Sequence, residues 1–136
     1  MPVIDASIWA ARFLRHDPHH EQSKRWFAAA VEKQLTLYAP TILLPEVASA
    51  IVRESKDRVA EKLAAEAVAV IEESGSKLVD VSLTLANRAS EICRKHHVRG
   101  CDAIYIALAE HLGEPLVTHD KQQKDRGSAV VETIWP

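Results

Sequence analysis

Residues 102–120 read DAIYIALAEHLGEPLVTHD and contain both kinds of segment from which the rest of the chain is built. The mainly apolar run 102–112 predicts a buried helix, and Gly113 ends it because glycine readily adopts the left-handed conformation found at helix C-termini. Residues 114–118 then predict a short buried strand that is followed by an acid. A helix and a short strand in this order are typical of an α/β protein with a parallel sheet.

The same alternation extends along the whole chain, with no linker or repeat to divide it. Strands are predicted at residues 2–5, 35–39, 77–81, 114–118 and 129–133. Helices are predicted at residues 6–15, 17–34, 41–54, 57–73, 82–97, 102–112 and 120–126. Predicted helix starts include Thr41, Asp57 and Ser82. We therefore expect a single α/β domain over residues 1–136, in which a mostly parallel, short-stranded central sheet lies between two layers of helices.

The composition excludes several classes of protein. Hydrophobic residues make up 47% and charged residues 26% of the 136 residues, which is ordinary for a globular domain. The net charge of −2 gives no overall attraction to nucleic acid or to an anionic membrane. Two cysteines cannot form a disulfide framework, and the longest apolar run, 103–109, is too short to span a bilayer. We expect a cytoplasmic protein with no membrane segment and no signal peptide.

Four acids stand where a parallel sheet would bring them together. Asp5 and Asp120 follow predicted strands, whereas Glu46 and Asp102 lie near the starts of predicted helices. The binding crevice of such a sheet lies beyond the carboxyl ends of its strands. Several carboxylates in one crevice repel each other unless a cation is present, and their oxygens suit Mg²⁺ or Mn²⁺. Such ions can activate water for cleavage of a phosphodiester.

Each acid alone also has a local explanation. Asp5, Asp102 and Asp120 each precede a predicted helix, where aspartate is a favoured N-cap. Glu46 would be an ordinary acid in the first turn of a helix. The argument for a metal site therefore rests on the whole set, and it fails if the four side chains lie apart in the fold.

Four segments resemble the acidic motifs of the PIN-domain ribonucleases, and the similarity is greatest to the VapC toxins of type II toxin–antitoxin pairs. The segments are VIDAS at 3–7, LPEVA at 44–48, GCDAIYIALA at 100–109 and PLVTHD at 115–120. They occur in the family's order and cover essentially the whole chain. The resemblance implies a PIN-like three-layer fold and a Mg²⁺- or Mn²⁺-dependent endoribonuclease that leaves 3′-hydroxyl and 5′-phosphate ends.

The resemblance also implies roles for individual acids. Asp5 and Asp102 match the principal metal ligands of the family, and Glu46 and Asp120 match the other two acids, which bind metal directly or through water. These four residues are the candidate catalytic set. Asp125 falls near a variable fifth acid.

Three neighbouring positions belong to the same comparison. Ser7 and Thr118 match small hydroxyl-bearing positions that support the site. His119 stands where members of the family often carry a small residue, which would alter the rim of the site.

The implied partners are an RNA substrate, a VapB-like antitoxin and a second copy of the chain. The helix pair 41–54 and 57–73 would supply the dimer contact and a groove for the antitoxin, or its apolar side chains would only pack within the chain. Basic residues near the acids would bind RNA phosphates, or they would serve only as helix-end and surface charges. These are Arg94, Lys95, Arg99, Lys121, Lys124 and Arg126.

Two alternative functions remain open at this stage. One is a non-catalytic binding module with the PIN fold. The other is an aspartate-based phosphatase of the haloacid-dehalogenase type, which would need a second acid two residues after Asp5, where Ser7 stands.

Overall fold

The computed structural model describes residues 1–55 and 58–136, and within them five short strands form one sheet with only parallel pairings. The strands are β1 (Val3–Ile4), β2 (Tyr38–Pro40), β3 (Lys77–Val79), β4 (Leu116–Val117) and β5 (Thr133–Ile134). Their order across the sheet is β3-β2-β1-β4-β5, so β1 lies at the centre. The expected α/β class with a parallel sheet is confirmed.

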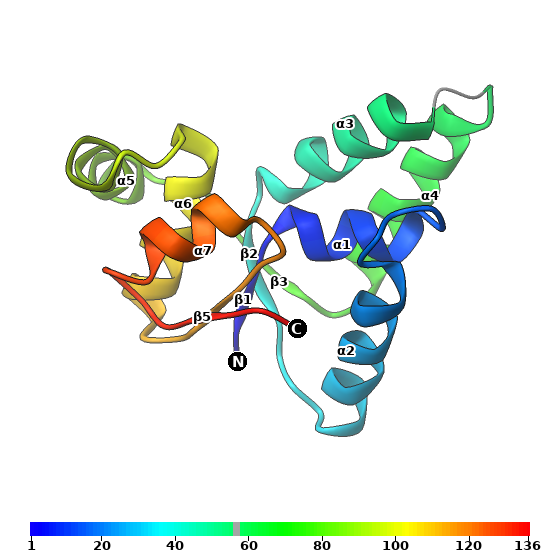
Figure 1. The fold of residues 1–136 in the computed structure, drawn as a ribbon, viewed down its shortest axis with the longest axis horizontal. Coiled ribbons are helices and arrows are strands. Elements are labelled where there is room, and N and C mark those ends of the chain that lie inside the picture. The colour runs from blue at the N-terminus through cyan, green and yellow to red at the C-terminus, as the bar shows by residue number, and fades with distance from the viewer. Residues whose placement is uncertain (56–57) are drawn as a thin grey trace.

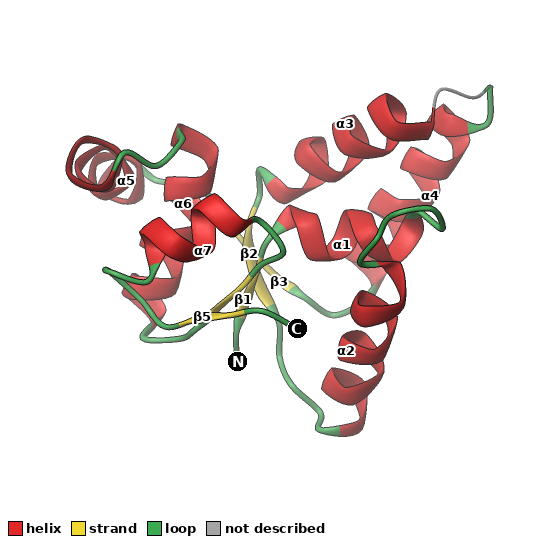
Figure 2. Cartoon of the chain, in the orientation of Figure 1, coloured by secondary structure: helices red, strands yellow, loops and turns green. Residues whose placement is uncertain are grey.

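The helices form two layers, one on each side of the sheet (Figures 1 and 2). They are α1 (Ala6–Phe13), α2 (His20–Glu32), α3 (Leu43–Ser55), α4 (Ala60–Glu73), α5 (Leu83–His96), α6 (Gly100–Leu112) and α7 (Lys121–Gly127). In Figure 2, α1 to α4 lie on one side and α5 to α7 on the other. Right-handed crossovers explain this division, because the chain builds β1, β2 and β3 toward one edge and then returns past β1 to build β4 and β5.

The reversal of direction creates a switch point between β1 and β4, which are direct neighbours in the sheet. Loops leave β1 and β4 in opposite directions there, toward α1 on one layer and α7 on the other. In open parallel sheets this is the place where a binding crevice forms. The candidate acids Asp5 and Asp120 therefore lie in the two loops that border it.

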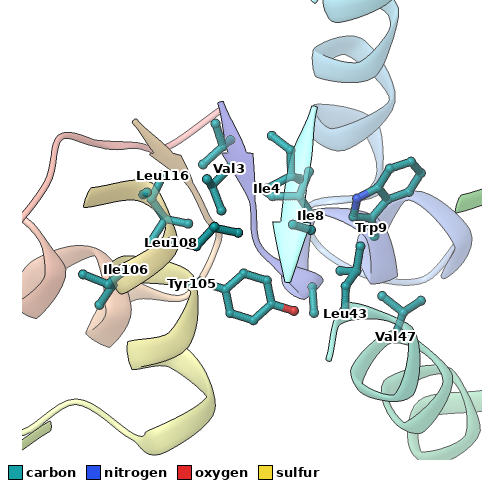
Figure 3. Close-up of a cluster of buried hydrophobic side chains, with 14 of the residues drawn as sticks. Val3, Ile4, Ile8, Trp9, Leu43, Val47, Tyr105, Ile106, Leu108 and Leu116 are labelled. Atoms are coloured by element: carbon teal, nitrogen blue, oxygen red, sulfur yellow. The ribbon is translucent and has the colours of Figure 1, made fainter. Parts of the chain in front are cut away.

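The core surrounds β1, whose Val3 and Ile4 are fully buried (Figure 3). On one face, α6 contacts β1, β2 and β4 and is buried around most of its circumference, which explains its nearly continuous apolar sequence. Figure 3 shows Tyr105 of α6 reaching toward Leu43 of α3. Leu43, Val47 and Ile51 of α3 are fully buried on the other side.

The strand predicted at 35–39 is wrong in its first half. Gln34 has a φ of 53°, and the Leu35 amide donates to the Ala30 carbonyl at 2.9 Å, so these residues form a turn that ends α2. The strand begins only at Tyr38, whose amide donates to the Pro2 carbonyl at 2.9 Å.

The strand predicted at 129–133 is also displaced. The amides of Val130 and Val131 both donate to the Gly127 carbonyl and so continue a turn from the end of α7. Only Thr133 and Ile134 pair with β4. Branched side chains here predicted a strand, but the hydrogen bonds of the helix terminus determine the local structure.

Several helix ends also differ from the prediction. α1 ends at Phe13, α3 begins at Leu43, and α6 begins at Gly100, which places Asp102 within the first turn of α6 and not at its N-cap. The helix start predicted at Asp57 lies outside the described residues. Ser82 does cap α5, since its side chain accepts a hydrogen bond from the Leu85 amide. No helix within the described residues has the length and hydropathy needed to cross a membrane.

The core assignment predicts a large difference between two neighbouring residues of α3. Ile51 is fully buried, whereas Val52 is 50% exposed. We expect Ile51→Ala to lower the free energy of unfolding by about 3 kcal/mol, because it leaves a cavity, and Val52→Ala to change it by less than about 0.5 kcal/mol. Urea denaturation followed by circular dichroism measures both. Equal effects of the two substitutions would contradict this description of the core.

Candidate active site

Asp5 lies directly after the central strand and is 5% exposed. Its Oδ2 accepts hydrogen bonds from the Ser7 amide at 3.1 Å and from Thr118 Oγ1 at 3.3 Å. Its Oδ1 accepts one from Gln123 Nε2 at 3.3 Å. The bond from Ser7 makes Asp5 the N-cap of α1, as its local explanation predicted. The other two bonds come from the end of β4 and from α7, so they fix the carboxylate in relation to both helix layers.

Ser7 and Thr118 connect the two loops at the switch point. Ser7 Oγ accepts a hydrogen bond from the His119 amide at 2.9 Å and lies 3.4 Å from Thr118 Oγ1. Thr118 Oγ1 in turn accepts one from the Asp120 amide at 2.9 Å. Both hydroxyl groups therefore lie beside Asp5, and they hold the loop after β4 against the start of α1.

Arg99 joins Asp102 and Asp120, which come from different helices. Its Nε is 3.0 Å from Asp102 Oδ2, and its Nη2 is 2.7 Å from Asp120 Oδ2. Asp120 also caps α7, because its Oδ1 accepts a hydrogen bond from the Gln123 amide at 2.9 Å. Asp102 is 8% exposed. A single guanidinium thus spans the gap between α6 and α7.

Glu46 approaches the same group of acids from the first turn of α3. Its Oε1 is buried without a hydrogen-bond partner among the described residues, as is the hydroxyl of Tyr105, which lies beside it. Burial, together with the negative charges of Asp5 and Asp102, raises the pKa of Glu46 to about 7, against the lowering effect of the Tyr105 hydroxyl and of Arg99. The fold therefore brings Glu46 within electrostatic reach of two of the other three acids.

Burial and like charge affect the other acids in the same way. Burial raises the pKa of Asp5 above its ordinary value, against the lowering effect of its hydrogen bonds. Burial, followed by the charge of Asp5, raises the pKa of Asp102 to about 6, although Arg99 opposes this rise. Asp102, followed by Asp120, raises the pKa of Arg99. The site therefore combines four carboxylates with one guanidinium and carries excess negative charge.

The donor set suits a divalent cation, but the side chains do not form a complete binding site for one. Carboxylate oxygens are the ligands that Mg²⁺ and Mn²⁺ prefer, and the unpartnered Glu46 Oε1 is such an oxygen. Within residues 1–55 and 58–136, however, no three histidine, cysteine, aspartate or glutamate side chains are grouped closely enough to hold a metal ion. The four acids share one edge of the sheet, and their role as ligands stays a prediction.

Sequence reasoning gave no role to two buried residues of the site. Gln123 is fully buried, and its Nε2 bonds to both Asp5 Oδ1 and the Asp102 carbonyl at 3.3 Å. Tyr105 is fully buried beside Glu46. Spacing offered a weak signal, because each lies three residues after an acid at the start of a helix and so faces the same direction as that acid.

His119 lies at the rim of the site and is buried in an aromatic cluster. Its ring stacks on that of His19 with centroids 4.4 Å apart, and Trp135 packs against it at 5.3 Å. Burial, followed by the nearby His19, lowers the pKa of His119 to about 4. The ring is therefore neutral at pH 7. Asp125, the variable fifth acid of the resemblance, is exposed on α7.

The raised pKa of Glu46 predicts how a substitution depends on pH. A carboxyl group whose pKa rises from 4.5 to about 7 on folding stabilises the fold below pH 4.5, and this contribution is lost as the pH rises to 7. Glu46→Gln cannot ionise, so in EDTA its melting temperature should exceed that of the wild type by roughly 3 °C at pH 8. The excess should shrink toward pH 5. A difference in melting temperature that does not change with pH would contradict the raised pKa of Glu46.

Comparisons with known proteins agree with this architecture. Residues 3–128 match the PIN domain family. No curated protein matches the chain in sequence.

Three solved structures show the same fold at low sequence identity. VapC20 of Mycobacterium tuberculosis is 21% identical over 100% of both chains, with a TM-score of 0.81. FitAcB of Neisseria gonorrhoeae is 14% identical over 98% of this chain and 96% of that chain, with a TM-score of 0.72. VapBC2 of Rickettsia felis is 16% identical over 98% and 97%, with a TM-score of 0.67. Because the family match spans nearly the whole chain and includes all four acids, the protein belongs to the PIN domain family.

Proposed function

We propose that this protein is a Mg²⁺- or Mn²⁺-dependent endoribonuclease and the toxin of a toxin–antitoxin pair. The observation that carries the proposal is the grouping of Asp5, Glu46, Asp102 and Asp120 at one edge of the sheet in a PIN domain. Without a cation, such a group of carboxylates is destabilised by mutual repulsion and by burial. Membership of the PIN domain family supports metal-dependent phosphodiester cleavage as the reason why the fold keeps these carboxylates together despite their repulsion.

The residues of the chain have distinct tasks in this proposal. Asp5, held by donors from three elements, offers oxygens in a fixed direction. Asp102 and Asp120 offer oxygens from the opposite helix layer, and Glu46 offers its buried Oε1, which lies beside the Tyr105 hydroxyl. A divalent ion bound among them would lower the pKa of a water molecule and stabilise the leaving oxygen of the phosphodiester.

Basic side chains around the acids would bind the RNA backbone. Arg94 and Lys95 lie in the last turn of α5, and Lys124 and Arg126 lie in the last turn of α7. Their positive charge attracts phosphates without reading sequence, so they position the substrate and do not select it. Local charge of this kind explains how a chain with a net charge of −2 could bind RNA.

The names of the relatives support the toxin role and an antitoxin partner. VapC20 is described as a sarcin–ricin-loop-cleaving toxin, and the Rickettsia protein was solved as VapBC2 bound to a promoter DNA fragment. By analogy with VapBC2 we infer a VapB-like antitoxin, and we also propose the homodimer and the cytoplasmic location that were expected from the sequence. A groove of about 820 Å³ between the loop after α1 and the adjoining ends of α3 and α4 is where an antitoxin segment would dock.

One observation favours a second candidate, a non-catalytic PIN-fold binding module. Within the described residues, no three potential metal ligands are grouped closely enough to hold an ion, and a protein that binds no metal would show the same. A phosphatase mechanism has less support, because Ser7, at the position of the required second acid, accepts a hydrogen bond from a backbone amide.

The first test is RNA cleavage by the purified protein. We expect cleavage with Mg²⁺ or Mn²⁺, none with EDTA, and a loss of about 100-fold or more in Asp5→Asn and Asp102→Asn. Asp80→Asn is the matched control, because Asp80 also follows a strand but is exposed at the edge of the sheet. Undiminished cleavage by both site variants would refute the site assignment. Gel analysis of total RNA with end mapping also tests for 3′-hydroxyl and 5′-phosphate products.

The second test separates the nuclease from the binding module without measuring activity. Mg²⁺ that binds only the folded protein should raise the melting temperature by about 3 °C at about ten times its Kd. Asp102→Ala should abolish this rise, whereas Asp80→Ala should retain it. A wild-type melting temperature that does not respond to millimolar Mg²⁺ or Mn²⁺ would favour the binding module. Differential scanning fluorimetry is sufficient.

A further inference from the structure

Arg99 occupies two of the oxygens that the proposed function assigns to a metal ion. It lies at the N-cap of α6, and one guanidinium bonds to Asp102 Oδ2 at 3.0 Å and to Asp120 Oδ2 at 2.7 Å. Within residues 1–55 and 58–136, every ion pair of these two aspartates is with Arg99. A positive charge therefore already stands among the acids, and it comes from the chain itself.

The position of Arg99 allows it to leave. Its side chain is 66% exposed, whereas those of Asp102 and Asp120 are only 11% and 26% exposed. Ion pairs of such exposed side chains contribute little to stability, since water competes for both charges. The acids, in contrast, are fixed by burial and by helix capping. When a stronger cation competes for these oxygens, the arginine is the group that moves.

We propose that Arg99 is an exchangeable counter-cation of the acid site. Without a bound metal ion, its single positive charge is shared between Asp102 and Asp120, and it must release at least one of them before a divalent ion can bind. This competition lowers the affinity of the site for metal. The inference rests on the proposed function, because it takes the acids to be metal ligands.

Release also gives Arg99 a second position. The freed guanidinium remains at the mouth of the site, where its planar fork can make paired hydrogen bonds to an RNA phosphate. Metal binding and substrate binding are then linked through one side chain. Loss of Arg99 should strengthen metal binding and weaken RNA binding, two opposite changes that a merely structural residue would not produce.

The decisive experiment is isothermal titration of the full-length, metal-free protein with MnCl₂. We expect Arg99→Gln to lower the Kd for Mn²⁺ by about fivefold, because only the competing pairs are removed. Arg99→Lys, which keeps the charge but cannot bridge two carboxylates with a rigid fork, should lie between. Arg25→Gln, an exposed arginine of α2 on the other helix layer, should leave the Kd unchanged.

A second measurement shows where Arg99 is and does not depend on affinity. The ¹⁵Nε–¹Hε signal of Arg99, assigned by its absence in Arg99→Gln, should shift when diamagnetic Mg²⁺ saturates the protein. In parallel, binding of an uncleaved RNA oligonucleotide in EDTA-free buffer with Ca²⁺ should weaken in Arg99→Gln relative to Arg25→Gln.

The outcomes separate the two proposals. If the wild type binds neither Mn²⁺ nor Mg²⁺, the metal-dependent function fails, and the role of Arg99 fails with it. If the wild type binds metal but Arg99→Gln binds it with equal or lower affinity, or the Arg99 signal does not move, only the counter-cation role is overturned. An increased affinity together with a shifted signal supports the proposal.

Discussion

The site depends on keeping several carboxylates close together where water cannot fully screen them. Asp5 is the buried member at the centre of this arrangement, and its oxygens are held by donors from α1, from the end of β4 and from α7. Each of these bonds stabilises the ionised form, whereas burial opposes it. The balance fixes the position of the charge without removing it. If Asp5 were free to turn outward, its repulsion with the other carboxylates would fall, but the four acids would no longer lie together.

The strand order is what makes such crowding possible. Because β1 and β4 are neighbours although more than a hundred residues separate them, the loops that follow them diverge into opposite helix layers. Their acids then face one another across the switch point, and α3 and α6 add Glu46 and Asp102. Local capping and the shared site are therefore not alternatives here. Asp5 and Asp120 each cap a helix with one oxygen, whereas the other oxygen accepts a hydrogen bond from Gln123 in Asp5 and from Arg99 in Asp120.

Arg99 offsets only part of the negative charge of the four acids. Arg99 pairs with the two acids that belong to the second helix layer, whereas Glu46 is left with a raised pKa and an unpartnered oxygen. Within residues 1–55 and 58–136, acids that influence one another electrostatically are still not grouped closely enough for three of them to hold a cation. Under the proposed function, Asp102 and Asp120 would exchange their ion pairs with Arg99 for a divalent ion.

The sequence by itself determined the class of fold and the approximate helices and strands, and it predicted which four acids lie together. Periodicity and glycine positions are local signals, and residues such as Gly113 and Ser82 act within a few positions of themselves. The strands predicted at 35–39 and 129–133 were misplaced. The backbone amides of Leu35, Val130 and Val131 donate to carbonyls in the turns that end α2 and α7, and so they do not pair with a neighbouring strand. Tertiary structure alone decided that Gln123 and Tyr105 belong to the site and that Arg99 bridges Asp102 and Asp120. The physical reason is that these contacts join segments whose distance depends on how the strands are ordered, and no local pattern encodes that order.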